Sequence, residues 1–252
     1  ILDKVNDHLL NSLGLDIQRY RYDAVPIDRT VDQHGLNLLG DISEIISNRN
    51  PVIFDVGSFR GDAIRIFQHI WPEATITGFE SDPDLLAILH NHWDSVPGVE
   101  IVNSAVPDGP PATQTHKNTS NVMSLGPAFQ SNPERNRAST GSIIVPTISL
   151  SDYCAASSIT HVDLLNVATQ GSELPVIQGA KEMLSEGAVR LVVIELTFDP
   201  IHGDRTRPSA VFSLLESLGY VCQGIFNQVG RSGQLERADG LWRRGLAPKD
   251  RS

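Results

Sequence analysis

Two acids and a pair of glycines occupy positions where α/β proteins hold a nucleotide-like ligand. The stretch Pro51–Gly61 is a short apolar run that includes Asp55, followed by Gly57 and Gly61. A buried strand, a tight glycine turn and a helix N-terminus in this order are typical of the ligand-binding start of such a domain. A second acid, Glu80, ends the next apolar run about 20–25 residues after the glycine turn, where nucleotide folds bind a ribose.

The spacing of the glycines indicates the class of ligand. The pattern is D-x-G-x-x-x-G and not the G-x-G-x-x-G that cradles a pyrophosphate at a helix N-terminus. S-adenosylmethionine (SAM) has no phosphate, but it carries an ammonium and a sulfonium, which an acid at a strand end complements. The loop therefore predicts SAM as the cofactor, bound by Asp55, Gly57, Ser58 and Gly61. A nicotinamide oxidoreductase is disfavoured by the same spacing.

Each cofactor contact has an ordinary structural alternative. Asp55 is expected to hold the cofactor ammonium directly or through water, and otherwise would be a helix N-cap. Glu80, with Ser81 beside it, is expected to accept the ribose hydroxyls, and otherwise would be a solvated strand-end carboxylate. Ser104 and Ala105 follow the third apolar run, where an adenine edge would lie.

The elements that must position these residues alternate between strand and helix. Repeated βα units predict an α/β fold with a doubly wound, mostly parallel sheet. Helices are expected at 63–70, 85–92, 176–184 and around 211–218. Seven runs have the composition of strands, the last two closing the sheet as an antiparallel pair: 52–56, 75–79, 99–102, 162–167, 191–196, 220–226 and 240–244.

Apolar residues at helical spacing also precede the first strand. They predict N-terminal helices over 2–13 and 38–46, packed ahead of the core. Residues 1–50 are therefore interpreted as an N-terminal helical extension and 51–252 as the cofactor-binding domain. Within that domain, Pro107–Ser142 is rich in Pro, Gly, Ser, Thr and Asn, and is expected to be a variable substrate loop: either a hairpin with a mobile loop over the ligand edge, or a disordered segment.

Composition narrows the classes of partner. The formal net charge of −10 disfavours nucleic acid and anionic membranes as partners. No apolar run reaches the roughly 18 residues that a membrane helix needs. Two cysteines, Cys154 and Cys222, give neither a disulfide framework nor metal-ligand spacing. We expect a cytoplasmic protein; association with further copies of itself stays open.

Several stretches in order resemble the FkbM family of SAM-dependent methyltransferases. These are Phe54-Asp55-Val56-Gly57 with Gly61, then Phe79–Pro83, Asn103–Val106, and Val162–Leu174 continuing to Ala180. The resemblance covers roughly Asp32 to Tyr220. It implies a Rossmann-like class I methyltransferase fold and methyl transfer from SAM, mostly to hydroxyl oxygens of sugars or secondary metabolites. The acceptor is then a small hydroxylated molecule, and residues 51–252 form a SAM-binding methyltransferase domain.

Two positions depart from the family pattern. The usual lysine is Asn166 and the usual acid is Ala168. Because an alanine is neither a metal ligand nor a base, no metal site is expected, unless Glu173, Glu195 or Asp199 substitutes. The departures also motivate a second hypothesis, a methyltransferase-like binding protein that has lost catalysis. The intact cofactor residues favour the enzyme.

The candidate bases for a hydroxyl acceptor are Glu173, Glu195 and His202. Glu195 ends a predicted strand, and His202 lies just beyond it. Glu173 begins a helix, where a carboxylate also simply suits the helix dipole, and His202 has the alternative of a surface loop histidine. His161 and Asp163 look like a catalytic pair, but they lie at the opposite end of their strand from the ligand edge.

Overall fold

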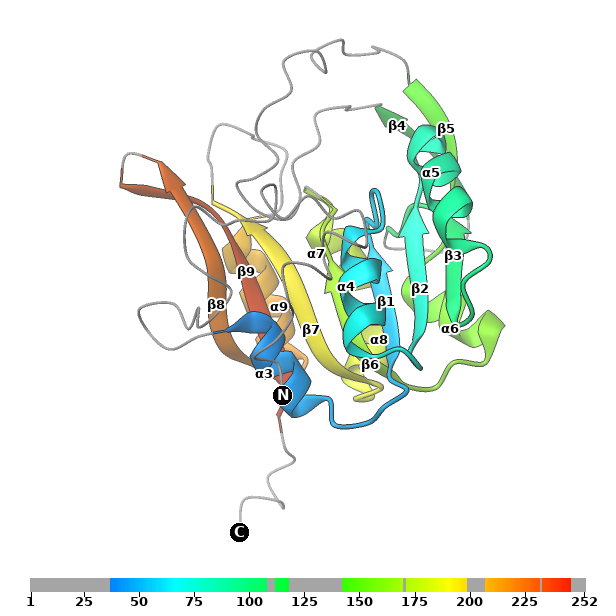
Figure 1. The fold of residues 1–252 in the computed structure, drawn as a ribbon. Coiled ribbons are helices and arrows are strands. Elements are labelled where there is room, and N and C mark those ends of the chain that lie inside the picture. Colours follow the sequence, from blue (N-terminus) through cyan, green and yellow to red (C-terminus); the bar gives the residue numbers. More distant parts are fainter. Residues whose placement is uncertain are drawn as a thin grey trace.

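The computed structural model describes residues 37–107, 112–117, 142–169, 171–198, 207–231 and 233–245. Within these ranges the chain forms a seven-stranded sheet in the order β3-β2-β1-β6-β7-β9-β8 (Figure 1). The first five strands of this order are parallel, whereas β9 is antiparallel to both neighbours. The predicted doubly wound sheet and its closing antiparallel pair are confirmed. The strands are β1 Val52–Val56, β2 Thr75–Glu80, β3 Val99–Asn103, β6 Val162–Val167, β7 Val189–Thr197, β8 Tyr220–Arg231 and β9 Gln234–Arg244.

Helices cover both faces of this sheet, and each face has its own hydrophobic cluster. On one face, residues of α3, α4 and α5 pack on Ile53, Ile76 and Leu164. On the other face, α6, α7, α8 and α9 pack on Phe54, Leu165 and Ile194. The helices are α3 Leu38–Ile45, α4 Asp62–Ile70, α5 Pro83–Trp93, α6 Leu150–Ser157, α7 Glu173–Gly179, α8 Lys181–Ser185 and α9 Pro208–Ser217.

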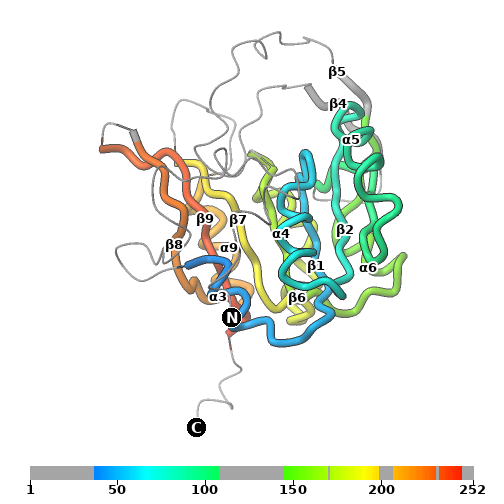
Figure 2. Tube along the Cα trace, in the orientation of Figure 1, coloured from blue at the N-terminus to red at the C-terminus, as the bar shows by residue number. Residues whose placement is uncertain are grey.

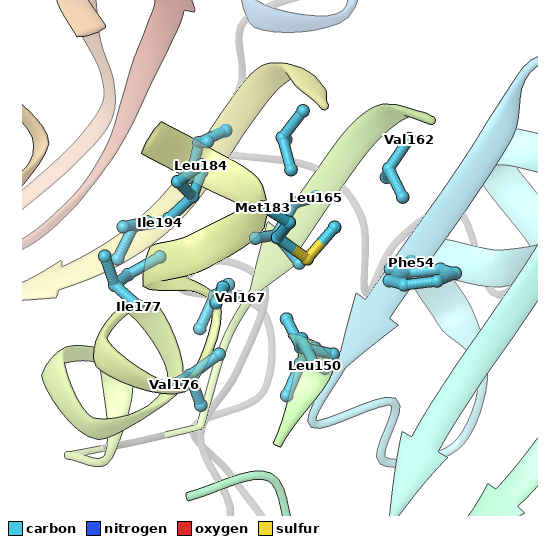
Figure 3. Close-up of a cluster of buried hydrophobic side chains, with 14 of the residues drawn as sticks. Phe54, Leu150, Val162, Leu165, Val167, Val176, Ile177, Met183, Leu184 and Ile194 are labelled. Atoms are coloured by element: carbon cyan, nitrogen blue, oxygen red, sulfur yellow. The ribbon is translucent and has the colours of Figure 1, made fainter. Parts of the chain in front are cut away.

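Alternation along the strands explains why one sheet has two cores. Successive side chains of a strand point to opposite faces, so Ile53 joins one cluster while Phe54 joins the other. Strand β6 is buried at all six positions, as a central parallel strand requires. Figure 3 shows the second cluster, with Leu165 and Val167 of β6 among residues from the neighbouring helices and strands.

Two local features differ from the expectations. The helix expected over 176–184 is divided into α7 and α8 at Gly179 and Ala180. A Cβ at Gly179 would lie 2.5 Å from the carbonyl oxygen of Pro107, so this glycine permits a close backbone approach where the helix breaks. Helix α6 was not expected. The sequence feature that indicates its start is the N-cap residue Ser149, whose side chain accepts a hydrogen bond from the Asp152 N–H.

The segment expected to be a variable substrate loop is described in part, and its role stays a prediction. β4 Ala112–Lys117 and β5 Ser142–Thr147 form an antiparallel pair, so the hairpin alternative is confirmed for these residues. Residues 108–111 and 118–141 lie outside the described residues. The helix expected over 2–13 also lies outside them. The helix expected over 38–46 is α3, whose Ile42 and the following Ile46 are buried in the core.

The parallel strands β1, β2, β6 and β7 all end at the same edge of the sheet. Figure 2 traces these strands, with α4 in front of β1. Among the described helices, none is long and apolar enough to span a membrane.

Candidate cofactor and acceptor site

The polar residues of the candidate site share one face and one edge of the sheet. Asp55 follows Ile53 by two residues, Asn166 follows Leu164 and Glu195 follows Val193, so all three side chains point to the face covered by α3, α4 and α5. The register places Asp55 of β1 opposite Asn166 of β6. Glu195 lies one strand further, on β7. The strand spacing of about 4.8 Å puts roughly 10 Å between β1 and β7. The edge therefore has two halves, one around Asp55 of β1 and one around Glu195 of β7.

The glycine turn after β1 has a conformation that its glycines make possible. Gly57 and Gly61 have φ of 85° and 81°, and Gly61 is the N-cap of α4. A Cβ at Gly57 would lie 2.5 Å from the carbonyl oxygen of Ala168. Phe59, although not a glycine, also has a positive φ of 52°. The turn is therefore pressed against the end of β6 in a backbone conformation that side chains disfavour.

The amide groups of this turn are directed toward β2. The N–H groups of Gly57 and Ser58 donate to the carbonyl oxygen of Phe79, at 3.0 and 3.1 Å, and that of Phe59 donates to Oε2 of Glu80 at 2.9 Å. A phosphate cradle needs such N–H groups for the ligand. Because these three have acceptors in the protein, the turn does not resemble a phosphate site. This geometry agrees with the expectation drawn from the glycine spacing.

Glu80 is held by three backbone N–H groups. Oε1 accepts from Ser81 and Asp82, at 2.7 and 2.9 Å, and Oε2 accepts from Phe59. Burial raises the pKa of Glu80 above its ordinary value, while these N–H groups act to lower it. A carboxylate can accept about four hydrogen bonds. Among the described residues this leaves one acceptor position on Oε2 unused, and a ribose hydroxyl is a suitable donor for it.

Asp55 is paired with Asn166, one of the two departures from the family pattern. Its side chain is 1% exposed, and Nδ2 of Asn166 donates to its Oδ1 at 2.7 Å. The other oxygen, Oδ2, is buried without a hydrogen-bond partner among the described residues. Burial raises the pKa of Asp55 to about 6, against the lowering effect of the bond from Asn166. Asp55 is not an N-cap, because Gly61 holds that position in α4.

Ser104 and Ala105 connect the end of β3 to β5. The Ser104 hydroxyl donates to the carbonyl oxygens of Ala105 and Pro146, and the Ala105 N–H donates to Pro146 at 2.9 Å. The Ser58 hydroxyl also has an acceptor within the protein, because it donates to the main-chain oxygen of Asp55 at 2.8 Å. These side chains shape the edge of the sheet, and their contact with an adenine stays a prediction.

The structure describes two of the candidate bases for the acceptor, Glu173 and Glu195, and their surroundings differ. Glu173 accepts from the Thr169 hydroxyl at 3.1 Å and from the Gly171 N–H at 2.9 Å. These bonds close the turn between β6 and α7, which favours a structural role. Glu195 is 6% exposed and sits at the carboxyl end of β7, where its Oε2 lies 3.9 Å from Nη1 of Arg237.

Strand β9 brings further charged residues to Glu195. In the antiparallel register Asp239 pairs directly with Glu195. Asn227, which has a φ of 48°, donates to Oδ2 of Asp239 at 2.7 Å. Burial raises the pKa of Asp239 to about 6, while Asn227 and Arg237 act to lower it. Sequence reasoning missed Arg237 and Asp239, because they lie in a strand whose insertion between β7 and β8 could not be placed from its own pattern.

The remaining candidates lie elsewhere or outside the described residues. Asp163 accepts from the backbone N–H of Val52 at 3.0 Å, and His161 contacts it at 3.2 Å. The pair therefore lies at the start of β1 and β6, away from the ligand edge, as expected. His202 and Asp199 are outside the described residues. Among the residues that the structure does describe, no three His, Cys, Asp or Glu side chains gather as a metal site would require; metal independence stays a prediction.

The chain is similar in sequence or structure to several known methyltransferases. The chain is 25% identical over 191 residues to the 2-O-methyltransferase NoeI of Sinorhizobium fredii, covering 72% of this chain and 78% of that protein. Among solved structures, the methyltransferase FkbM of Methylobacillus flagellatus is similar with a TM-score of 0.48 and 12% identity over 77% of this chain. This chain spans 44% of the length of that protein.

A second solved structure bears on the fold alone. An rRNA methylase from Streptococcus thermophilus matches with a TM-score of 0.50 and 7% identity, over 88% of this chain and 100% of that one. Its likeness agrees with the expected Rossmann-like class I methyltransferase fold. The model of the "Methyltransferase FkbM domain" matches residues 55–222, which include the glycine turn, Glu80, Asn166 and Glu195. The chain therefore belongs to the FkbM family of methyltransferases.

Proposed function

We propose that this protein transfers the methyl group of SAM to a hydroxyl oxygen of a small molecule, such as a sugar or a secondary metabolite. The observation that carries the proposal is the division of one sheet edge into an anionic cofactor half and a separate carboxylate at Glu195. The name of the relative NoeI, a 2-O-methyltransferase, supports oxygen as the accepting atom.

The residues present fit SAM better than a dinucleotide. The buried carboxyl group of Asp55 and the partly buried carboxyl group of Glu80 complement a cation, and the amides of Gly57, Ser58 and Phe59 already have acceptors within the protein. Oδ2 of Asp55, which has no partner among the described residues, is suited to the ammonium of SAM. Oε2 of Glu80 is suited to a ribose hydroxyl.

In this reaction the protein has two main tasks. It aligns the acceptor hydroxyl with the methyl group, and it removes the hydroxyl proton. SAM, when bound, supplies a methyl group that its sulfonium makes electrophilic. The protein holds the acceptor oxygen near roughly 3 Å from that carbon, which contributes several kcal/mol to lowering the barrier. The acceptor oxygen forms the new bond to carbon, the carbon–sulfur bond breaks, and the hydroxyl proton passes to a base.

Glu195 is our favoured base among the described candidates. It lies at the carboxyl end of β7, the end of the parallel strands where ligands bind in such sheets. Glu173 already accepts two hydrogen bonds within its own turn. His202 stays a candidate from the sequence. A base within hydrogen-bond reach of the acceptor hydroxyl raises the rate of the reaction about 10²–10⁴-fold.

We further propose that turnover needs no divalent metal. Ala168 stands at the end of β6 where the resemblance implies an acid, and β9 places Asp239 opposite Glu195 and brings Nη1 of Arg237 to 3.9 Å from its Oε2. A cation beside Glu195 disfavours a second cation at the same carboxylate.

Transfer of a labelled methyl group tests this function. The full chain is incubated with methyl-labelled SAM and a panel of monosaccharides, oligosaccharides and phenolic or polyketide alcohols, with EDTA or with Mg²⁺. Label in a product whose methyl group is on oxygen, unchanged by EDTA, supports the proposal. Label only with Mg²⁺ contradicts metal independence. SAM binding without transfer to any hydroxyl favours the alternative of a binding protein.

A further inference from the structure

The pair formed by Asn166 and Asp55 joins two central strands at the ligand edge. The two residues are 111 positions apart in the sequence, and both are more than nine-tenths buried. The amide of Asn166 donates to Oδ1 of Asp55 at 2.7 Å. Since Asn166 is in the middle of the sheet and opposite Asp55 in register, its side chain has a fixed position from which to orient the carboxylate.

The second oxygen of Asp55 accepts no hydrogen bond of ordinary geometry from the described residues, although the nearby Ser58 hydroxyl, which donates to the main-chain oxygen of Asp55, acts to lower the pKa of this carboxyl. Oδ2 is buried and has no hydrogen-bond partner among them. The charged groups that act on this carboxyl are themselves acids, Glu80 at the end of β2 and Asp62 in the first turn of α4. A buried carboxylate oxygen surrounded by acids is matched best by a cationic N–H donor.

We propose that Asn166 is a positioning residue for the cofactor: by donating to Oδ1 it leaves Oδ2 of Asp55 to accept a hydrogen bond from the ammonium group of SAM. This inference rests on the proposed binding of SAM. Asn166, where the resemblance implies a lysine, is then part of the cofactor site. A lysine at this position would neutralise Asp55, whereas the amide orients the carboxylate and leaves its negative charge for the ligand.

The arrangement couples cofactor binding to the protonation of Asp55. Burial raises the pKa of this group to about 6, so in the absence of ligand it takes up a proton in mildly acidic solution. Only the ionised form complements an ammonium fully. The affinity for a ligand with an ammonium therefore falls as the pH falls through about 6, by up to tenfold for each pH unit.

Titration calorimetry of the full chain with S-adenosylhomocysteine and with methylthioadenosine, from about pH 5 to pH 7.5, tests the proposal. Both ligands carry adenine and ribose, but only S-adenosylhomocysteine has the ammonium. We expect the affinity for S-adenosylhomocysteine to fall about tenfold between pH 7 and pH 5, with a much smaller change for methylthioadenosine. An equal pH dependence for both ligands would overturn the proposal, because Glu80 and the ribose would then account for it.

Two substitutions separate positioning from folding. Asn166→Leu removes the donor and raises the pKa of Asp55 further, so the loss of affinity begins at higher pH. Asn166→Lys supplies a cation, so the affinity becomes independent of pH over the same range. The matched control is Asn48→Leu, which removes a similar Asn–Asp bond, to Asp163, at the other end of the sheet.

The outcomes distinguish this inference from the proposed function. Unchanged pH profiles in both Asn166 variants would contradict the positioning role, even where SAM binds and methyl transfer proceeds. Failure of the natural chain to bind either ligand would contradict the proposed function itself. If Asn166→Leu does not fold, Asn166→Lys and the comparison of the two ligands in the natural chain still decide the question.

Discussion

Gly57 lies so close to Ala168 that a methyl group on its Cα would come within 2.5 Å of the Ala168 carbonyl oxygen. The contact joins the glycine turn to the end of β6, directly beside Asp55 and Asn166. Because Gly57 also has a φ of 85°, both sterics and backbone conformation require a glycine here. The cofactor half of the site therefore depends on a residue with no functional group.

Gly57→Ala tests this dependence. We expect a loss of stability larger than the roughly 1–2 kcal/mol of left-handed backbone strain alone, together with loss of S-adenosylhomocysteine binding. Gly233→Ala is the control, because Gly233 has a φ of 81° but no atom within 4 Å of the place that a methyl group would occupy. Urea unfolding and calorimetry measure the two effects. Equal destabilisation by both variants would show that the contact with Ala168 is unimportant.

Glu80→Ala tests the ribose contact and the support of the turn together. The substitution removes the acceptor of three backbone N–H groups, so we expect a stability loss of about 1–3 kcal/mol and at least about a 100-fold weaker affinity for S-adenosylhomocysteine. Asp82→Ala, which removes the N-cap of α5, should cost about 1 kcal/mol without weakening binding. Normal binding by the Glu80 variant would place the ribose elsewhere.

Glu195→Gln and Glu173→Gln separate the base from a structural acid. With Glu195→Gln we expect turnover about 10²–10⁴-fold lower at unchanged cofactor affinity, since the amide cannot take the hydroxyl proton. With Glu173→Gln we expect lower stability from the disturbed bonds to Thr169 and Gly171, and a smaller change in turnover. Steady-state kinetics with thermal unfolding measures both. The reverse ranking of turnover would assign the base to Glu173.

Asp239 makes stability depend on pH in a direction that can be checked. Its folded-state pKa of about 6 is above the ordinary value of 3.8, so between these values the unfolded chain has lost a proton that the folded chain keeps. The free energy of unfolding therefore falls as pH rises through this window, and Asp55 acts in the same direction. Asp239→Asn removes one of the two titrations.

We expect Asp239→Asn to gain stability relative to the natural chain as the pH rises from about 4 to about 7. An asparagine still offers an oxygen to the donor Asn227. Glu73→Gln, at an exposed position, controls for the change in net charge. Urea unfolding at several pH values decides the point. A stability difference that does not vary with pH would contradict the raised pKa of Asp239.

The strands and the ligand edge could be predicted from the sequence, because both follow from local patterns. Each parallel strand has its own apolar run, and Asp55 and Glu80 stand beside the turns that follow such runs. Contacts between distant segments could not be predicted in the same way. The pairing of Asn166 with Asp55 depends on the register between β1 and β6, and that of Asp239 with Glu195 on the insertion of β9. Neither register leaves a signal in the sequence nearby.

The most direct test of the account is calorimetric titration of the purified chain with S-adenosylhomocysteine near neutral pH, with and without Mg²⁺. We expect one site per chain with micromolar affinity, the same in both conditions. Absence of binding in both would contradict the assignment of Asp55, Gly57 and Glu80 to a cofactor site, and binding only with Mg²⁺ would contradict a metal-independent site beside Ala168.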